Sequence, residues 1–328
     1  MVLGVKMSKI DVIIPSCKKD VDTLDLCIEA IKKNVKDVNR IIVVSREKLT
    51  DNAEFFAEEK LPYSIKDVGD IIGFHHKIFN YYSDLIQATA AMVIPDLSNN
   101  VLICDSDTIF LNPIEFIDDE GRALYCPSYD IPANVTHHPY LEHAEKMIPG
   151  LKKQTRYSGI VHHILLQRHI LQEIYDKVEK RTGMPFWKAT LTAATEDFEC
   201  LPRKPKIENS PLRMTIYELY FNYVLKYHAD STKLRMTKNI LSYKGHMGVA
   251  NEEVHNFPSR TNLYGNVQIL PKSEESKFSF DSFAESCRYI SQRCKEEGWD
   301  AATFQNHTRI GVKEHAKRNV KYMKELTE

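Results

Sequence analysis

Short apolar runs alternate with helix-like segments along the N-terminal part of the chain. The runs at 10–16, 40–45 and 101–104 are rich in Ile, Val and Leu, whereas 22–34 spaces its apolar residues on one helical face and 75–93 reads as a long helix. Alternating strands and helices indicate βαβ units, and continuously apolar strands fit a sheet that is covered on both faces. We therefore expect an α/β fold with a mixed, mainly parallel sheet flanked by helices.

The remainder of the chain predicts further elements of both kinds. The segments 63–68 and 123–130 are predicted strands. After residue 271 the spacing of apolar residues is typical of a helix, so we expect a helical C-terminal extension. The expected organisation is one domain over 8–270 and a helical segment over 271–328 packed on it.

Composition and charge argue against several classes of function. Of the 328 residues, 43% are hydrophobic and 27% are charged, which is ordinary for a soluble globular protein. The 44 basic and 45 acidic residues leave a net charge of -1, and no basic stripe indicates a nucleic-acid partner. No stretch has the length of a transmembrane segment, and the N-terminus lacks the layout of a signal peptide. The seven cysteines form no C-x-x-C pair, which suggests a reducing compartment, and we expect a cytoplasmic protein.

The apolar run 101–104 continues directly into Asp-Ser-Asp. Burying an unpaired charge is costly, so Asp105 and Asp107 need a partner or an open edge of the sheet. Ligands of open parallel sheets bind beyond the carboxyl ends of the strands, and the strand period of two puts both carboxylates on the same side. Hard oxygen ligands of this kind suit Mn²⁺ or Mg²⁺, which commonly bind substrate phosphates as well. The plainer alternative is that Asp105 caps a turn and Asp107 pairs with a surface lysine.

Two other classes of function stay open on the residues alone. An apolar strand that ends in D-x-D also resembles the haloacid-dehalogenase-like phosphatases, in which the first aspartate, here Asp105, would be the nucleophile. Their motif has Thr or Val two residues after the second aspartate, where this chain has Ile109, and it usually lies on the first strand. A non-catalytic protein that binds nucleotides or glycans is the third class.

A set of segments in a fixed order resembles the nucleotide-sugar glycosyltransferases of the GT-A fold. The set comprises DVIIPSCKKD, VLICDSDTIFLNP, YSGIVHHILLQRHILQEIY, MPFWKATL and IYELYFNYV, from about residue 10 to about residue 250. The segments look like a glycosyltransferase family found in bacteria and in some large DNA viruses of algae. The resemblance implies a Rossmann-like GT-A domain that uses Mn²⁺ or Mg²⁺. It also implies transfer of a sugar from a nucleoside-diphosphate sugar, with UDP-sugar favoured, to a glycan or glycoprotein acceptor.

The resemblance further implies which residues contact the donor. In such folds the end of the first strand holds the base and the ribose. The matching residues here are Ile14, Pro15, Ser16, Cys17 and Lys19. Lys77 opens a helix, where a cation and the helix dipole would meet diphosphate oxygens, the alternative being a solvated lysine. Ser106 and His162 are the remaining expected donor contacts, and at most one of His162 and His163 faces the site because neighbours on a strand point to opposite sides.

The expected metal ligands are Asp105, Asp107 and His246. His246 lies in a glycine-bracketed turn, where the backbone can approach a phosphate closely. The Lys-Pro-Trp that usually follows such a histidine in the family is absent here, which is a departure from the pattern.

Glu218 and Asp197 are the candidate catalytic acids. Glu218 lies among aromatic residues, where the pKa of a carboxylate can rise toward the range of a useful general base. The alternative is that its aromatic neighbours form a helix core stripe and Glu218 faces solvent. A base of this kind is needed for inversion at the anomeric carbon and not for retention, and the sequence leaves both outcomes open.

Overall fold

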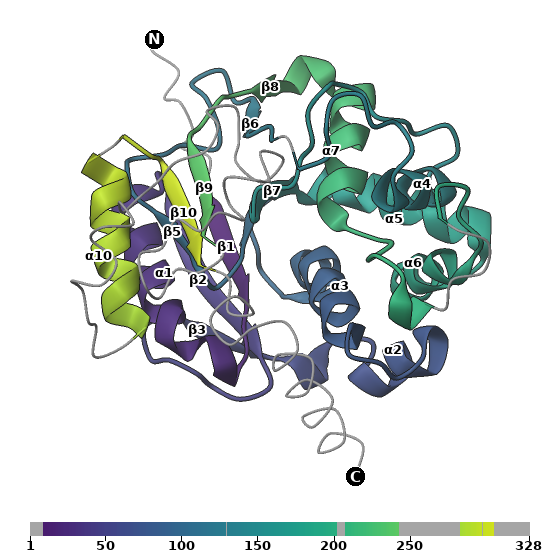
Figure 1. The fold of residues 1–328 in the computed structure, drawn as a ribbon, viewed down its shortest axis with the longest axis horizontal. Helices are drawn as coiled ribbons and strands as arrows, with labels where there is room; N and C mark the ends of the chain where they lie inside the picture. The colour runs from purple at the N-terminus through teal and green to yellow at the C-terminus, as the bar shows by residue number, and fades with distance from the viewer. Residues whose placement is uncertain (1–8, 129, 202–206, 243–282, 297, 305–328) are drawn as a thin grey trace.

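A five-stranded sheet in the order β3-β2-β1-β4-β7 forms the centre of the computed structural model, which describes residues 9–128, 130–201, 207–242, 283–296 and 298–304 (Figure 1). The strands are β1 (Ile10–Pro15), β2 (Val38–Ser45), β3 (Glu54–Ala57), β4 (Asn100–Cys104) and β7 (His163–Gln167). The first four are parallel, and β7 runs antiparallel to β4. The expected α/β class with a mixed, mainly parallel sheet is confirmed.

Helices flank this sheet on both sides. Figure 1 shows α1 (Val21–Asn34) and α10 (Phe283–Glu296) on one side. The other side carries α3 (Ile78–Val93), α5 (Arg168–Thr182), α6 (Phe186–Thr195) and α7 (Ile216–Tyr227), with α2 (Ile65–Ile72) and α4 (Pro139–Met147) further out. No helix in the part of the chain that the structure describes is long and apolar enough to span a membrane.

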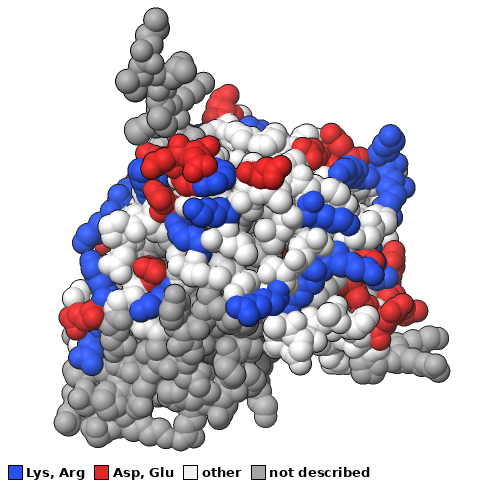
Figure 2. Space-filling view, turned by 90° about the horizontal axis from the view of Figure 1, so that it is seen from above, with Lys and Arg blue, Asp and Glu red and all other residues white. Residues whose placement is uncertain are grey.

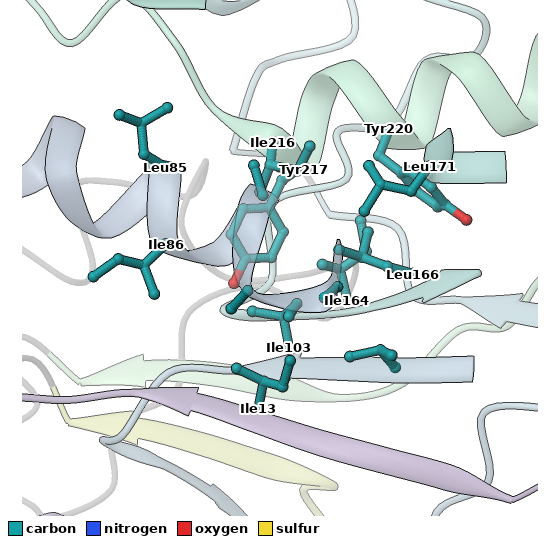
Figure 3. Packing of buried hydrophobic residues seen from close by; sticks show 14 of the residues in the cluster. Ile13, Leu85, Ile86, Ile103, Ile164, Leu166, Leu171, Ile216, Tyr217 and Tyr220 are labelled. Atoms are coloured by element: carbon teal, nitrogen blue, oxygen red, sulfur yellow. The ribbon is translucent and has the colours of Figure 1, made fainter. Parts of the chain in front are cut away.

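The core lies on both faces of the sheet, against the helices α3, α5 and α7 on one side and α1 on the other. In Figure 3, Leu85 of α3 and Tyr217 of α7 lie above Ile103 of β4 and Ile13 of β1. Ile13 and Ile103 are fully buried, as expected for a sheet covered on both faces. On the face shown in Figure 2, basic and acidic side chains both occur, in keeping with the nearly balanced charge.

The C-terminal segment contributes a strand as well as the expected helix. β10 (Ala301–Phe304) lies between β5 (Thr108–Phe110) and β9 (Asn239–Ser242) in a three-stranded sheet. β6 (Ala123–Tyr125) pairs with β8 (Thr232–Leu234) in a two-stranded sheet. α10 packs on α1. The strand was missed because the short run Ala-Ala-Thr-Phe mixes two alanines, which are depleted in strands, with Thr and Phe, which are enriched, and so shows no clear pattern.

The predicted strand at 63–68 is wrong, because this region begins helix α2. The Ser64 hydroxyl accepts a hydrogen bond from the Asp67 amide at 3.2 Å, and the Asp67 carboxylate accepts one from the Ser64 amide at 2.7 Å. This reciprocal capping box satisfies two amides at the start of a helix. The helix ends at Gly73, whose φ of 87° is easily adopted only by glycine.

Candidate functional site

The carboxylate pair lies where β4 ends, beside the end of β1. The two strands are parallel neighbours, with Ile13 opposite Ile103, so the residues that follow each strand emerge at the same edge of the sheet. Asp105 and Asp107 lie in the tight turn between β4 and β5, in which the Thr108 amide donates to the Asp105 carbonyl at 3.0 Å. The structure therefore brings the predicted pair to the predicted edge.

Asp105 is held from two sides by side chains of other elements. Gln87 of α3 donates to one carboxylate oxygen at 2.8 Å, and Nδ1 of His162 lies 2.9 Å from the other. The Asp105 amide also donates to the His162 carbonyl at 3.0 Å. Burial alone would lower the pKa of His162, but the hydrogen bond and the charge of Asp105 outweigh it, so the pKa is raised.

Asp107 carries the least compensated charge of the site. Burial, with the charges of Asp105 and Asp20, raises the pKa of its carboxyl to about 7, against the opposite influence of His162 and Lys19. Its carboxylate accepts no hydrogen bond from the residues described, whereas its carbonyl accepts one from the Phe304 amide of β10 at 2.9 Å. A carboxylate in this state is suited to a cation.

The two carboxylates fit a hard divalent cation that has further coordination positions open. Asp105 and Asp107 supply carboxylate oxygens, which Mg²⁺ and Mn²⁺ prefer. No group of three or more His, Cys, Asp and Glu side chains able to hold a metal occurs among the described residues. Asp105 and Asp107 fit such an ion as ligands, and the third expected ligand, His246, lies outside the described residues.

The end of β1 reaches this site as expected. Ile14 and Ser16 are buried, Pro15 and Cys17 are half-buried, and the charge of the exposed Lys19 acts on Asp107. The hydroxyl of Ser16 is buried and has no hydrogen-bond partner among the residues described. The Cys17 thiol donates to Asp20 at 3.3 Å, and burial raises its pKa to about 12, so it is neutral. The expected donor contact Ser106, between the two carboxylates, is buried at 6% exposure.

Lys77 is not brought to the carboxylate pair. It precedes the first turn of α3, ten residues before Gln87, which places it roughly 15 Å away along the helix axis. Its ammonium group donates to the Ser210 carbonyl, and burial together with Arg213 lowers its pKa. The described contacts thus connect Lys77 to the 207–213 segment and leave its expected phosphate contact without support.

Glu218 is fully buried, contrary to the alternative that it faces solvent. One carboxylate oxygen accepts hydrogen bonds from the Ser158 hydroxyl and from the Gly159 amide, the latter at 3.0 Å, and the other accepts one from Asn222 at 2.9 Å. Burial raises the pKa of Glu218, against these hydrogen bonds and the charge of Lys153. Asp197 is exposed just after α6, and no described contact connects it to Asp105 or Asp107.

Sequence reasoning missed two residues of this site. Gln87 and Asp84 lie one helical turn apart on α3, and burial raises the pKa of Asp84 to about 7. Asp84 accepts a hydrogen bond from the Ile216 amide at 3.2 Å and so holds the start of α7. The Tyr217 hydroxyl is buried without a hydrogen-bond partner in the described part of the chain. Burial, together with the charges of Asp105 and Asp84, raises its pKa. The signal in the sequence that could have indicated Asp84 and Gln87 is that they are polar residues on a helix predicted to be buried.

Comparison with known proteins adds little to this description. No protein-family model matches the chain, and no curated protein matches it. The expected membership in a family of bacteria and algal viruses thus has no support. Among solved structures, an active-site mutant of LgtC matches at 13% identity and TM-score 0.34, over 55% of this chain and 68% of that one. The apo form of mouse xyloside xylosyltransferase 1 matches at 11% identity and TM-score 0.38, over 91% of this chain and 99% of that one.

Both similarities are too low to carry an argument about donor, acceptor or chemistry. The α/β architecture itself, a mixed and mainly parallel sheet flanked by helices, is the one expected of a GT-A fold.

Proposed function

We propose that this protein is a metal-dependent glycosyltransferase. It would transfer a sugar from a nucleoside-diphosphate sugar, with UDP-sugar favoured, to a glycan or glycoprotein acceptor. One observation carries the proposal: two carboxylates, Asp105 and the poorly compensated Asp107, lie beyond β4, next to the end of β1. This is the edge at which open α/β sheets bind nucleotides, and carboxylates there suit a cation that also binds phosphates.

Each part of the site has a role in this proposal. Ile14 to Cys17 would contact the nucleoside, and Asp107, with Asp105 beside it, would hold Mn²⁺ or Mg²⁺. The bound ion would neutralise charge on the leaving diphosphate. Asp105 keeps its orientation through Gln87 and His162. The third metal ligand proposed from the sequence is His246, which is supported only by the sequence resemblance.

The test is a titration of UDP and of GDP by calorimetry, with Mn²⁺ and with EDTA. We expect one nucleotide to bind in the presence of Mn²⁺ and to lose at least about tenfold in affinity in EDTA or in Asp107→Asn. Asp70→Asn is the matched control, because Asp70 is an aspartate on α2 whose partner is the exposed Lys66. Absence of nucleotide binding under every condition would refute the proposal, and binding without any turnover of UDP-sugars would indicate a non-catalytic protein.

The phosphatase alternative receives no support from the site. In those phosphatases the nucleophile usually follows the first strand, whereas Asp105 follows β4, and Ile109 stands where their motif has Thr or Val. Hydrolysis of a simple phosphomonoester that is abolished in Asp105→Asn would reverse this judgement.

A further inference from the structure

We propose that Glu218 is a positioning residue, which holds the segment 158–162 so that His162 keeps Asp105 oriented. The role of Asp105 itself rests on the proposed function, whereas the contacts that link Glu218 to it do not. The inference replaces the general-base role that the sequence suggested for Glu218 by one that acts through other residues.

The first link joins α7 to the segment 158–159. Glu218 accepts hydrogen bonds from Ser158 and Gly159 on one oxygen and from Asn222, one helical turn further along α7, on the other. Asn222 in turn accepts a hydrogen bond from the Gln154 amide at 2.8 Å. A fully buried carboxylate with three donors is well stabilised where it is, and removing it would leave those donors without a partner.

The second link fixes the position of Gly159 against the same helix. A Cβ atom at Gly159 would lie 2.6 Å from the Cβ atom of Phe221, so the backbone approaches α7 as closely as only glycine allows. Ser158 also exchanges two backbone hydrogen bonds with Ser128, at 2.8 and 2.9 Å. Hence Ser158 and Gly159 are held on both sides, three residues before His162.

The third link reaches the carboxylate pair. His162 has a φ of 62°, in the left-handed region, and this bend immediately precedes β7. It directs both the carbonyl and the ring of His162 at Asp105: the carbonyl accepts from the Asp105 amide at 3.0 Å and the ring nitrogen lies 2.9 Å from the carboxylate. A non-glycine residue keeps such a conformation only when its surroundings enforce it, and the segment held by Glu218 leads directly into it.

Two substitutions separate a positioning role from a general base. Glu218→Gln keeps an oxygen for Ser158 and Gly159, replaces the oxygen that accepts from Asn222 by an NH2 group, and cannot take up a proton. Glu218→Leu has a similar volume and removes every acceptor. Glu142→Leu is the matched control, because Glu142 of α4 also accepts two hydrogen bonds, from the amides of Glu199 and Cys200, and touches no residue of the site.

The first readout is amide hydrogen exchange at Asp105, which needs no ligand. We expect Glu218→Leu to speed exchange at Asp105 by about tenfold or more, with Glu218→Gln and Glu142→Leu close to wild type. The second readout is Mn²⁺-dependent UDP affinity, which we expect to fall by a similar factor in Glu218→Leu alone. If Glu218→Leu does not fold, Ser158→Ala removes one of the three donors and should shift both readouts in the same direction.

Two results would overturn the inference. One is unchanged exchange at Asp105 in Glu218→Leu. The other is a Glu218→Gln protein that binds nucleotide normally, retains exchange protection and has lost turnover of the donor, since only a base would be affected in that way. If the wild-type protein binds no nucleotide at all, the proposed function fails, and the exchange comparison still decides the role of Glu218.

Discussion

His162 and Asp105 contact each other through both backbone and side chain. The Asp105 amide donates to the His162 carbonyl at 3.0 Å, and the His162 ring lies 2.9 Å from the Asp105 carboxylate. The pair connects the end of β4 with the beginning of β7. The two strands run antiparallel, with Cys104 opposite His163. The first aspartate of the D-x-D motif is thereby fixed before any ligand binds.

Substitutions at His162 can separate loss of the ring contact with Asp105 from strain in the backbone. Asn tolerates a φ of 62° and cannot reproduce the ring contact, whereas Val also suffers steric strain in the left-handed region. In urea denaturation, we expect the free energy of unfolding of His162→Val to be about 1–2 kcal/mol lower than that of His162→Asn. Both variants should weaken Mn²⁺-dependent UDP binding alike. Equal stabilities would mean that this backbone conformation is not kept in solution.

Gly159 should tolerate no side chain. Its added Cβ would collide with Phe221, and the buried α7 has no room to move away. We expect Gly159→Ala to cost about 1–3 kcal/mol of unfolding free energy, the usual range for overpacking. Gly183→Ala is the comparison, because its Cβ meets nothing within 4 Å and its cost comes from a φ of 67° alone. A Gly159→Ala protein as stable as wild type would contradict the close packing of 158–159 on α7.

Local patterns in the sequence predicted the frame of the fold and the place of the carboxylate pair. The apolar runs at β1, β2 and β4 are buried strands, and a strand that ends in Asp105 has to deliver its charge at a sheet edge. α2 was misassigned because a short apolar run fits either element, and the deciding signal was the Ser64–Asp67 capping box.

The partners of the carboxylates could not be predicted in the same way. Gln87 and Asp84 lie on a helix that is largely buried, and nothing local says that one of them meets Asp105 and the other the start of α7. The sequence singled out Glu218 as a candidate catalytic acid. Its burial and three donors depend on how 158–159 packs, which is a property of the assembled fold.

The strand β10 should stabilise β5, the strand that follows the D-x-D motif, through a pair of threonines. The hydroxyls of Thr108 on β5 and Thr303 on β10 lie 2.9 Å apart, and both side chains are buried. Thr108→Val or Thr303→Val alone leaves one hydroxyl unsatisfied and should cost about 1–2 kcal/mol, whereas the double variant should cost less than the sum. A double-mutant cycle by urea denaturation measures this coupling. Additive costs would mean that the C-terminal strand does not pair with β5 in solution.

The free energy of unfolding should also fall as the pH rises, because Glu58, which lies away from the carboxylate pair, becomes ionised. Burial raises the pKa of Glu58 to about 7, against a hydrogen bond from Tyr82 and the charge of Arg46. The folded state therefore holds this proton more tightly than the unfolded chain. The stabilisation is fully present below the ordinary pKa of 4.5 and is lost as the pH rises through 7.

Glu58→Gln should remove this dependence because the amide does not ionise. We expect the variant to gain about 1–3 kcal/mol relative to wild type between pH 4.5 and pH 8, measured as the difference in unfolding free energy at the two values. Glu59→Gln, at the exposed neighbouring residue, is the control and should follow the wild-type profile. If Glu58→Gln and wild type lose stability in parallel over this range, the carboxyl group of Glu58 ionises in the folded protein as easily as in water.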